Sequence, residues 1–138
     1  FASKASSFIQ AFSAIGLIPD SGGTFILPRL IGWQKATALM MLGDKVGAEE
    51  AEKMGMIYKA VEADELMEAA TKVATRLSNM ATYGLGLTKR ALNASFTNDL
   101  KTQLELEGEL QTLAGQSHDY KEGVNAFLEK RKPNYKGN

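Results

Sequence analysis

The chain has no cysteine and only one histidine, His118, among its 138 residues. The lack of cysteine excludes disulfide cross-links, thiolate nucleophiles and zinc sites built from cysteine ligands. A single imidazole excludes every mechanism that needs two. No apolar run approaches the roughly 20 residues of a membrane-spanning helix, and the first residues lack the regions of a secretory signal peptide. We therefore expect a cytoplasmic protein that does not enter a membrane.

The chain also lacks a net charge, because its 16 basic side chains balance its 16 acidic ones. Proteins that bind nucleic acids or anionic membranes electrostatically usually carry an excess of Lys and Arg. No nucleic-acid partner is therefore expected. Apolar residues make up 44% of the chain, and a domain of this length buries roughly two-thirds of its unfolded surface. A core without disulfides or a metal is thus feasible.

Strand signals are scarce. Residues 8–12 alternate between apolar and polar types, and residues 56–61 are short and rich in β-formers, so each predicts a strand. Apolar periodicity predicts helices elsewhere. The first three helices cover residues 24–31, 33–42 and 48–54; the first is expected to kink or stop early at Pro28 and to end at Gly32, and the second to be largely buried. The next covers residues 64–79. The remaining predicted helices are a stretch that is interrupted at residues 84–86 and ends at Phe96, a helix that Asp99 caps and that reaches about Gly115, and residues 119–131.

Two short strands cannot form a stable sheet of their own, because an isolated pair leaves its edges and one face uncovered. Either the domain is essentially a helical bundle, or further strands of the same sheet lie on a segment outside this chain. The chain begins with Phe1 instead of Met. We take this as favouring the second alternative.

The densest chemical signal is the glycine-rich segment of residues 15–24, IGLIPDSGGT. The Gly22-Gly23 pair lets the backbone approach a ligand closely, and the N–H groups of a following helix attract an anion. Asp20 has two interpretations. As a helix N-cap it would be inert, and local sequence alone favours this because Asp is a preferred capping residue. Among Ile15, Ile18 and other apolar neighbours, it could instead be semi-buried and transfer protons.

Other polar groups have ordinary interpretations. Neither the phosphate-binding loop nor the dinucleotide-binding glycine pattern is present. The lone His118 is expected in a surface loop. Without accompanying histidines, the acidic cluster favours a solvated helix face over a metal site, and the basic groups favour exposed charge over a phosphate-binding role. The acidic cluster comprises Asp44, Glu49, Glu50 and Glu52, and the basic groups are Lys89-Arg90 and Lys130-Arg131-Lys132.

Three separated segments in order resemble the crotonase superfamily, the enoyl-CoA hydratase/isomerase group. They are IGLIPDSGGTFILPRLIG, LGDKVGAEEAEKMGMIYKAV and EGVNAFLEKRKPNY. The resemblance covers essentially the whole chain but only the C-terminal half of the family's chain. It implies an α/β fold in which residues 1–62 are the C-terminal part of a spiral of ββα turns and residues 63–138 a helical oligomerisation region. It also implies a homotrimer or a dimer of trimers.

The resemblance further implies an acyl-CoA thioester substrate, held by two backbone N–H groups that stabilise an enolate-like intermediate. Both donors belong to the half of the family's chain that is not present. Hydratases carry a glutamate where Phe12 stands here, and a small residue where Asp20 stands. This departure is similar to the isomerase branch that uses an aspartate at the turn, as in dienoyl-CoA isomerases and especially 1,2-epoxyphenylacetyl-CoA isomerases. The resemblance therefore favours the proton-transfer interpretation of Asp20 over the capping interpretation and implies that Asp20 is the acid/base.

By the same resemblance, Pro19, Gly22 and Gly23 contact the substrate, while Phe127 and Lys130 match residues that reach the CoA adenine and phosphates. Their three-residue spacing puts ring and ammonium on one helix face. Packing between C-terminal helices is an equal alternative for Phe127. No metal or redox cofactor is expected, since CoA arrives as part of the substrate.

The sequence leaves two alternatives to the isomerase function. One is an enoyl-CoA hydratase whose second carboxylate lies in the other half. The other is a non-catalytic helical assembly module, because the isolated chain is expected to have no activity and to bind CoA esters poorly.

Overall fold

The computed structural model describes all residues from Phe1 to Asn138. Their contacts form two compact units, Phe1–Thr71 and Lys72–Asn138, which are described separately. The division falls inside helix α4 (Leu66–Ser78), between residues 71 and 72 instead of 62 and 63. The roles predicted for residues 1–62 and 63–138 do not follow from this division and stay predictions.

Four two-residue strands lie in the first unit. β1 (Ala2–Ser3) pairs in parallel with β4 (Ala60–Val61), and β2 (Ser7–Phe8) pairs antiparallel with β3 (Val46–Gly47). Two sheets of two strands each match the predicted shortage of strands. Ala2, Ala48 and Ala60 form the buried cluster of this unit, with Phe8 and Ile57 packed against it.

The strand predicted over residues 8–12 is wrong beyond Phe8. Residues Ala11–Ile15 form a 3-10 helix, η1, which ends at Gly16 in the left-handed conformation (φ 74°). The backbone N–H of Leu17 donates to the Phe12 carbonyl at 3.0 Å and closes this turn. The strand predicted over residues 56–61 is confirmed only at its last two residues.

Three helices complete the first unit: α1 (Gly23–Ile31), α2 (Trp33–Leu42) and α3 (Ala48–Lys53). Pro28 lies inside α1 without ending it, and the N–H of Gly32 donates to the Pro28 carbonyl at 3.0 Å. The early stop is therefore wrong, although the end at Gly32 is confirmed. The bounds of α2 are confirmed, but its predicted burial is wrong because only Ala36 is buried. Leu42 is 70% exposed.

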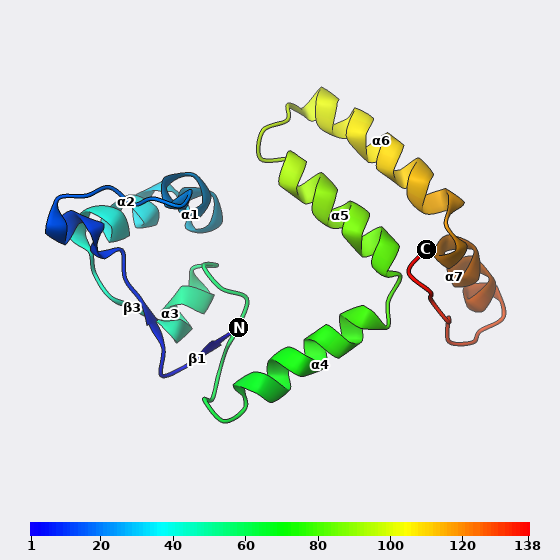
Figure 1. Ribbon diagram of the computed structural model, residues 1–138, viewed down its shortest axis with the longest axis horizontal. Helices are drawn as coiled ribbons and strands as arrows, with labels where there is room; N and C mark the ends of the chain where they lie inside the picture. Colours follow the sequence, from blue (N-terminus) through cyan, green and yellow to red (C-terminus); the bar gives the residue numbers. More distant parts are fainter. The chain divides into compact units, whose positions relative to one another are not determined.

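The second unit contains the end of α4 and three further helices, α5 (Thr82–Ala94), α6 (Leu100–Gln116) and α7 (His118–Leu128). Figure 1 shows α5 and α6 side by side, connected by a short loop. α5 passes through Gly84 and Gly86 without the predicted interruption. Each glycine weakens a helix by about 1 kcal/mol relative to alanine, and packing against α6 offsets this cost.

Side chains cap the last two helices. Asp99 accepts a hydrogen bond from the Thr102 N–H at 2.7 Å, which confirms the predicted cap and lowers the pKa of this carboxyl. Ser117 accepts from the Tyr120 N–H at 3.0 Å and starts α7 one residue before the prediction. None of the helices is long and apolar enough to cross a membrane.

Candidate functional site

The glycine-rich segment forms a tight turn immediately before α1. The N–H of Gly23 donates to the Asp20 carbonyl at 2.8 Å. The two residues between them, Ser21 (φ 52°) and Gly22 (φ 78°), both have positive φ, as in a type I′ turn. The structure therefore brings Pro19, Asp20, Gly22 and Gly23 together at the start of α1.

Asp20 is not the cap of α1. Gly22 occupies the N-cap position, and no side chain makes a capping hydrogen bond there. The Asp20 side chain instead accepts one hydrogen bond, from the Ser21 hydroxyl at 3.1 Å. The capping interpretation is therefore wrong, and the carboxylate has no structural role in the helix.

Burial of Asp20 is also not as predicted, because its side chain is exposed in this chain. Its apolar neighbours are exposed as well, with Ile15 at 73% and Ile18 at 79%. The carboxylate thus lies on a surface where apolar side chains face outward. Phe12 lies within η1 and is half-buried.

The two glycines of the turn differ in their requirements. The positive φ of Gly22 is a conformation that side-chain-bearing residues rarely adopt. Gly23 has no such φ, and a Cβ there would be 3.6 Å from the Pro19 Cβ, an ordinary contact. Backbone geometry therefore explains a glycine at position 22, and nothing within this chain explains the one at position 23.

Phe127 and Lys130 lie at the end of α7, in the other unit. Phe127 is 83% exposed, so the packing interpretation of this ring is wrong for the chain described. Lys130 is also exposed and has a positive φ of 54°. The helix predicted to continue to residue 131 ends at Leu128, because Lys130 turns the chain away.

The residues after α7 fold back along it and are held by two carboxylates. Asp119 is buried and accepts hydrogen bonds from the N–H groups of Lys136 (2.7 Å) and Gly137 (2.8 Å). Its own N–H donates to the Asn138 carbonyl at 3.0 Å, so the C-terminus lies beside the start of α7 (Figure 1). Burial raises the pKa of Asp119, but the hydrogen bonds outweigh it and hold this pKa below its usual value.

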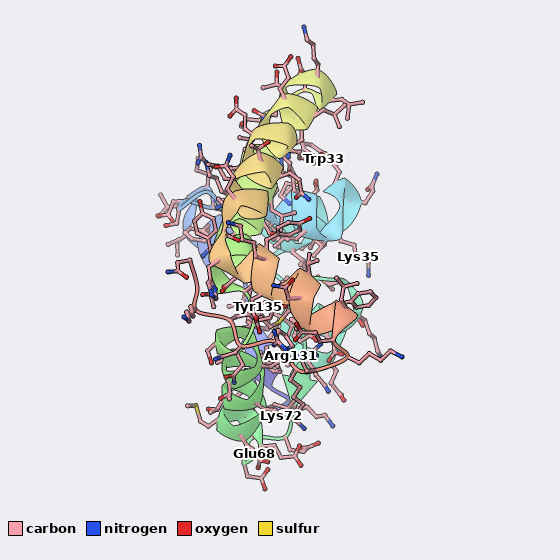
Figure 2. The ribbon with its side chains drawn as sticks, turned by 90° about the vertical axis from the view of Figure 1, so that its right-hand side faces the viewer. Trp33, Lys35, Glu68, Lys72, Arg131 and Tyr135 are labelled. Atoms are coloured by element: carbon pink, nitrogen blue, oxygen red, sulfur yellow. The ribbon has the colours of Figure 1, made fainter.

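Glu122 is the second carboxylate. Its two oxygens accept from the Arg131 guanidinium at 2.6 and 2.9 Å, and one of them accepts from the Asn134 N–H at 2.7 Å. Arg131 and Tyr135 lie alongside α7 in Figure 2. The hydrogen bonds from Arg131, followed by that from Asn134, lower the pKa of Glu122 to about 2.

Sequence patterns did not reveal these two carboxylates. Their partners lie 9 to 18 residues further along the chain, so no helical spacing links them. His118 is the first residue of α7 instead of a loop residue, and its Nδ1 lies 3.4 Å from an Asp119 oxygen. Arg131 is exposed, as predicted for the basic group at residues 130–132, but it is also paired with Glu122 and Glu129.

The remaining charged clusters show ordinary contacts. Glu49 and Glu50 lie in the first turn of α3, as expected for favourable charge there, and Glu50 pairs with Lys35 at 3.5 Å. Glu52 accepts from the Ala60 N–H at 2.7 Å. No group of three or more His, Asp or Glu side chains is arranged to hold a metal ion. Lys89 and Arg90 are exposed on α5.

The carboxylate contacts predict how the C-terminal residues respond to acid. The pKa of Glu122 is lower in the folded chain (about 2) than its ordinary value of 4.5. Its stabilising contribution is therefore complete above about pH 4.5 and is lost as the pH falls toward 2. We expect the amide signal of Asn134, whose N–H donates to Glu122, to lose protection in this pH range, measured by NMR hydrogen exchange. In Glu122→Gln, Asn134 should be less protected already at neutral pH.

The fold and the turn before α1 define the family. A family model described as enoyl-CoA hydratase/isomerase matches residues 1–138, and the chain belongs to this family, the crotonase superfamily. It is 48% identical over 136 residues to the 1,2-epoxyphenylacetyl-CoA isomerase of Escherichia coli (strain K12), covering 99% of the chain and 52% of that protein. It is 34% identical over 134 residues to the crotonyl-CoA hydratase of Syntrophomonas wolfei, covering 97% of the chain and 52% of that protein.

Solved structures give the same result. A Mycobacterium abscessus structure described as an enoyl-CoA hydratase/isomerase superposes with a TM-score of 0.93 at 35% identity, covering 99% of the chain and 52% of that structure. A Bacillus anthracis enoyl-CoA hydratase superposes with a TM-score of 0.94 at 32% identity, covering 99% and 53%. The predicted crotonase fold is confirmed. The chain spans about half the length of the relatives it matches.

Proposed function

We propose that this chain forms part of an acyl-CoA isomerase in which Asp20 transfers the proton. The observation that supports the proposal is the free carboxylate at the turn before α1. It caps no helix and forms no ion pair with Lys or Arg within the chain. It also follows Phe12, which stands where family resemblance implies a second carboxylate in hydratases. A carboxylate without a structural role is available for chemistry.

In the proposed reaction, the Asp20 carboxylate removes a proton from the carbon beside the thioester carbonyl and returns it to another carbon of the same acyl group. The substrate gains and loses no atoms, so a double bond or an epoxide ring is rearranged with one mobile carboxylate. Oxyanion donors, expected outside this chain by family resemblance, would stabilise the enolate-like intermediate by several kcal/mol each. No metal or redox cofactor is needed, because CoA enters with the substrate.

Hydration requires more than isomerisation does, because a second group must activate the attacking water molecule. The similarity to a crotonyl-CoA hydratase keeps hydration as the alternative. Two hybrid enzymes separate isomerisation from hydration. In one, called the chimaera below, this chain replaces the matching segment of the Escherichia coli isomerase, and in the other it replaces that of the Syntrophomonas wolfei crotonyl-CoA hydratase, which supplies the other half of a hydratase. We expect the chimaera to isomerise a 3-enoyl-CoA and both hybrids to hydrate crotonyl-CoA poorly, measured by separating the products chromatographically. Rapid hydration of crotonyl-CoA would contradict the isomerase assignment.

The isolated 138-residue chain is expected to show no isomerase turnover and to bind CoA esters weakly. The physical reason is that family resemblance places the oxyanion donors outside this chain, and such donors supply a large part of the rate enhancement. Turnover by the purified chain, measured against the chimaera at equal concentration, would refute this dependence. Sedimentation of the same sample tests the predicted trimer.

A further inference from the structure

Lys130 ends α7 in a conformation that is unusual for a residue with a side chain. Its N–H donates to the Phe127 carbonyl at 3.2 Å, and the Arg131 N–H donates to the Ala126 carbonyl at 3.0 Å. This pair of bonds is a Schellman motif, in which the residue at the position of Lys130 is usually glycine. A lysine with φ 54° at this position is unfavourable because of its Cβ.

Backbone conformations of this kind persist where the surrounding structure determines them, and they concentrate at functional positions. Glu122 supplies the determining contacts. It binds the guanidinium of Arg131, directly after Lys130, and the N–H of Asn134, three residues later. The Schellman bonds fix Lys130 from the helix side, and Glu122 fixes the chain that leaves it.

Arg131 contacts two carboxylates, Glu129 and Glu122, which differ in exposure and in their other partners. Arg131 also contacts Glu129, which lies next to Lys130 and is exposed. The Glu122 side chain is only 15% exposed, and it alone joins Arg131 to Asn134. Removal of the Glu129 side chain is therefore expected to leave residues 131–134 in place. Removal of the Glu122 side chain is expected to free residues 131–134, while Asp119 still holds Lys136 and Gly137.

We propose that Glu122 is a positioning residue that holds Lys130 in its left-handed backbone conformation and thereby fixes the direction in which its ammonium group leaves the end of α7, available to an anionic, phosphate-bearing ligand. The ligand assignment rests on the proposed function as an acyl-CoA enzyme and on the CoA contacts that family resemblance implies for Phe127 and Lys130. The positioning by Glu122 rests on the contacts alone. A glycine would adopt this backbone conformation more easily, so a lysine here makes the folded chain less stable but provides a charged side chain.

Three variants of the 138-residue chain test the proposal. Glu122→Ala removes the contacts with Arg131 and Asn134, while alanine preserves α7 because it is the best helix former. Glu129→Ala is the matched control on the same guanidinium. Lys130→Gly removes the ammonium and the unfavourable Cβ together. The backbone carbon chemical shifts and the amide-to-Hα coupling of residue 130 report its φ in this chain. Calorimetric titration of the chimaera carrying the same substitutions reports CoA binding, because the isolated chain is expected to bind CoA esters weakly.

In Glu122→Ala we expect residue 130 to leave the left-handed conformation and CoA binding to weaken at least threefold, with neither change in Glu129→Ala. In Lys130→Gly we expect a higher Tm and weaker CoA binding, opposite effects that a purely structural role would not produce. An unchanged backbone at residue 130 in Glu122→Ala, or a lower Tm in Lys130→Gly, overturns the proposal. If the chimaera binds CoA equally well with and without Lys130→Gly, the proposed CoA contact fails, and the backbone measurement still decides the role of Glu122.

Discussion

Replacement of Asp20 by asparagine in the chimaeric enzyme is expected to lower kcat for isomerisation by about 10²- to 10⁴-fold, the range typical for the loss of a general acid/base. An amide has nearly the same shape as a carboxylate but cannot accept and return a proton at this position. KM should change little, because the substitution removes an interaction that matters in the transition state. Steady-state kinetics with a 3-enoyl-CoA measure both constants.

Stability should be almost unaffected by the same substitution. The Asp20 side chain makes a single hydrogen bond, with the Ser21 hydroxyl, and is exposed. Surface substitutions of this kind usually stay within about 0.5 kcal/mol. A loss of activity with an unchanged Tm therefore identifies chemistry as the cause.

Ser21→Gly is the matched control. It deletes the hydroxyl that contacts Asp20, and glycine tolerates the positive φ of 52° at position 21. We expect activity close to that of the unmodified chimaera. If Asp20→Asn keeps more than a third of its activity, Asp20 is not the proton-transfer group.

Features of the chain that depend on neighbouring residues could be predicted from the sequence. Apolar periodicity and a following glycine determined α2, whose bounds are those predicted, and Asp99 caps α6 through the N–H of Thr102, three residues later. The N-cap assigned to Asp20 failed for a local reason that composition does not reveal. Because Ser21 and Gly22 both adopt positive φ, the chain turns once more before α1, and Gly22 takes the cap position.

Features that depend on distant residues could not be predicted. Asp119 and Glu122 have their partners in the residues after α7, which no periodicity connects to them. Site residues were proposed from the sequence only where a motif matched the family, at Asp20 and at Phe127 with Lys130, and their roles stay predictions. Local sequence also could not show that the apolar side chains around Asp20 face outward, because burial depends on which other elements cover them.

Replacement of Leu110 by alanine is expected to destabilise the second unit by about 2–5 kcal/mol, the usual cost of removing a buried leucine side chain. Leu110 is 5% exposed on α6, and it lines a cavity of about 520 Å³ together with residues of α5 such as Leu87 and Ala91. The space left by the side chain would adjoin this cavity, so the helices would lose contacts that few other buried residues of the unit provide.

The same helix offers a control, because Leu100 is 76% exposed. Leu100→Ala should change stability by no more than about 0.5 kcal/mol. Native-state hydrogen exchange in α5 and α6 measures the difference, and a loss of 2 kcal/mol corresponds to an increase of about 30-fold in exchange rate. Equal effects of the two substitutions would show that α5 and α6 do not pack through Leu110.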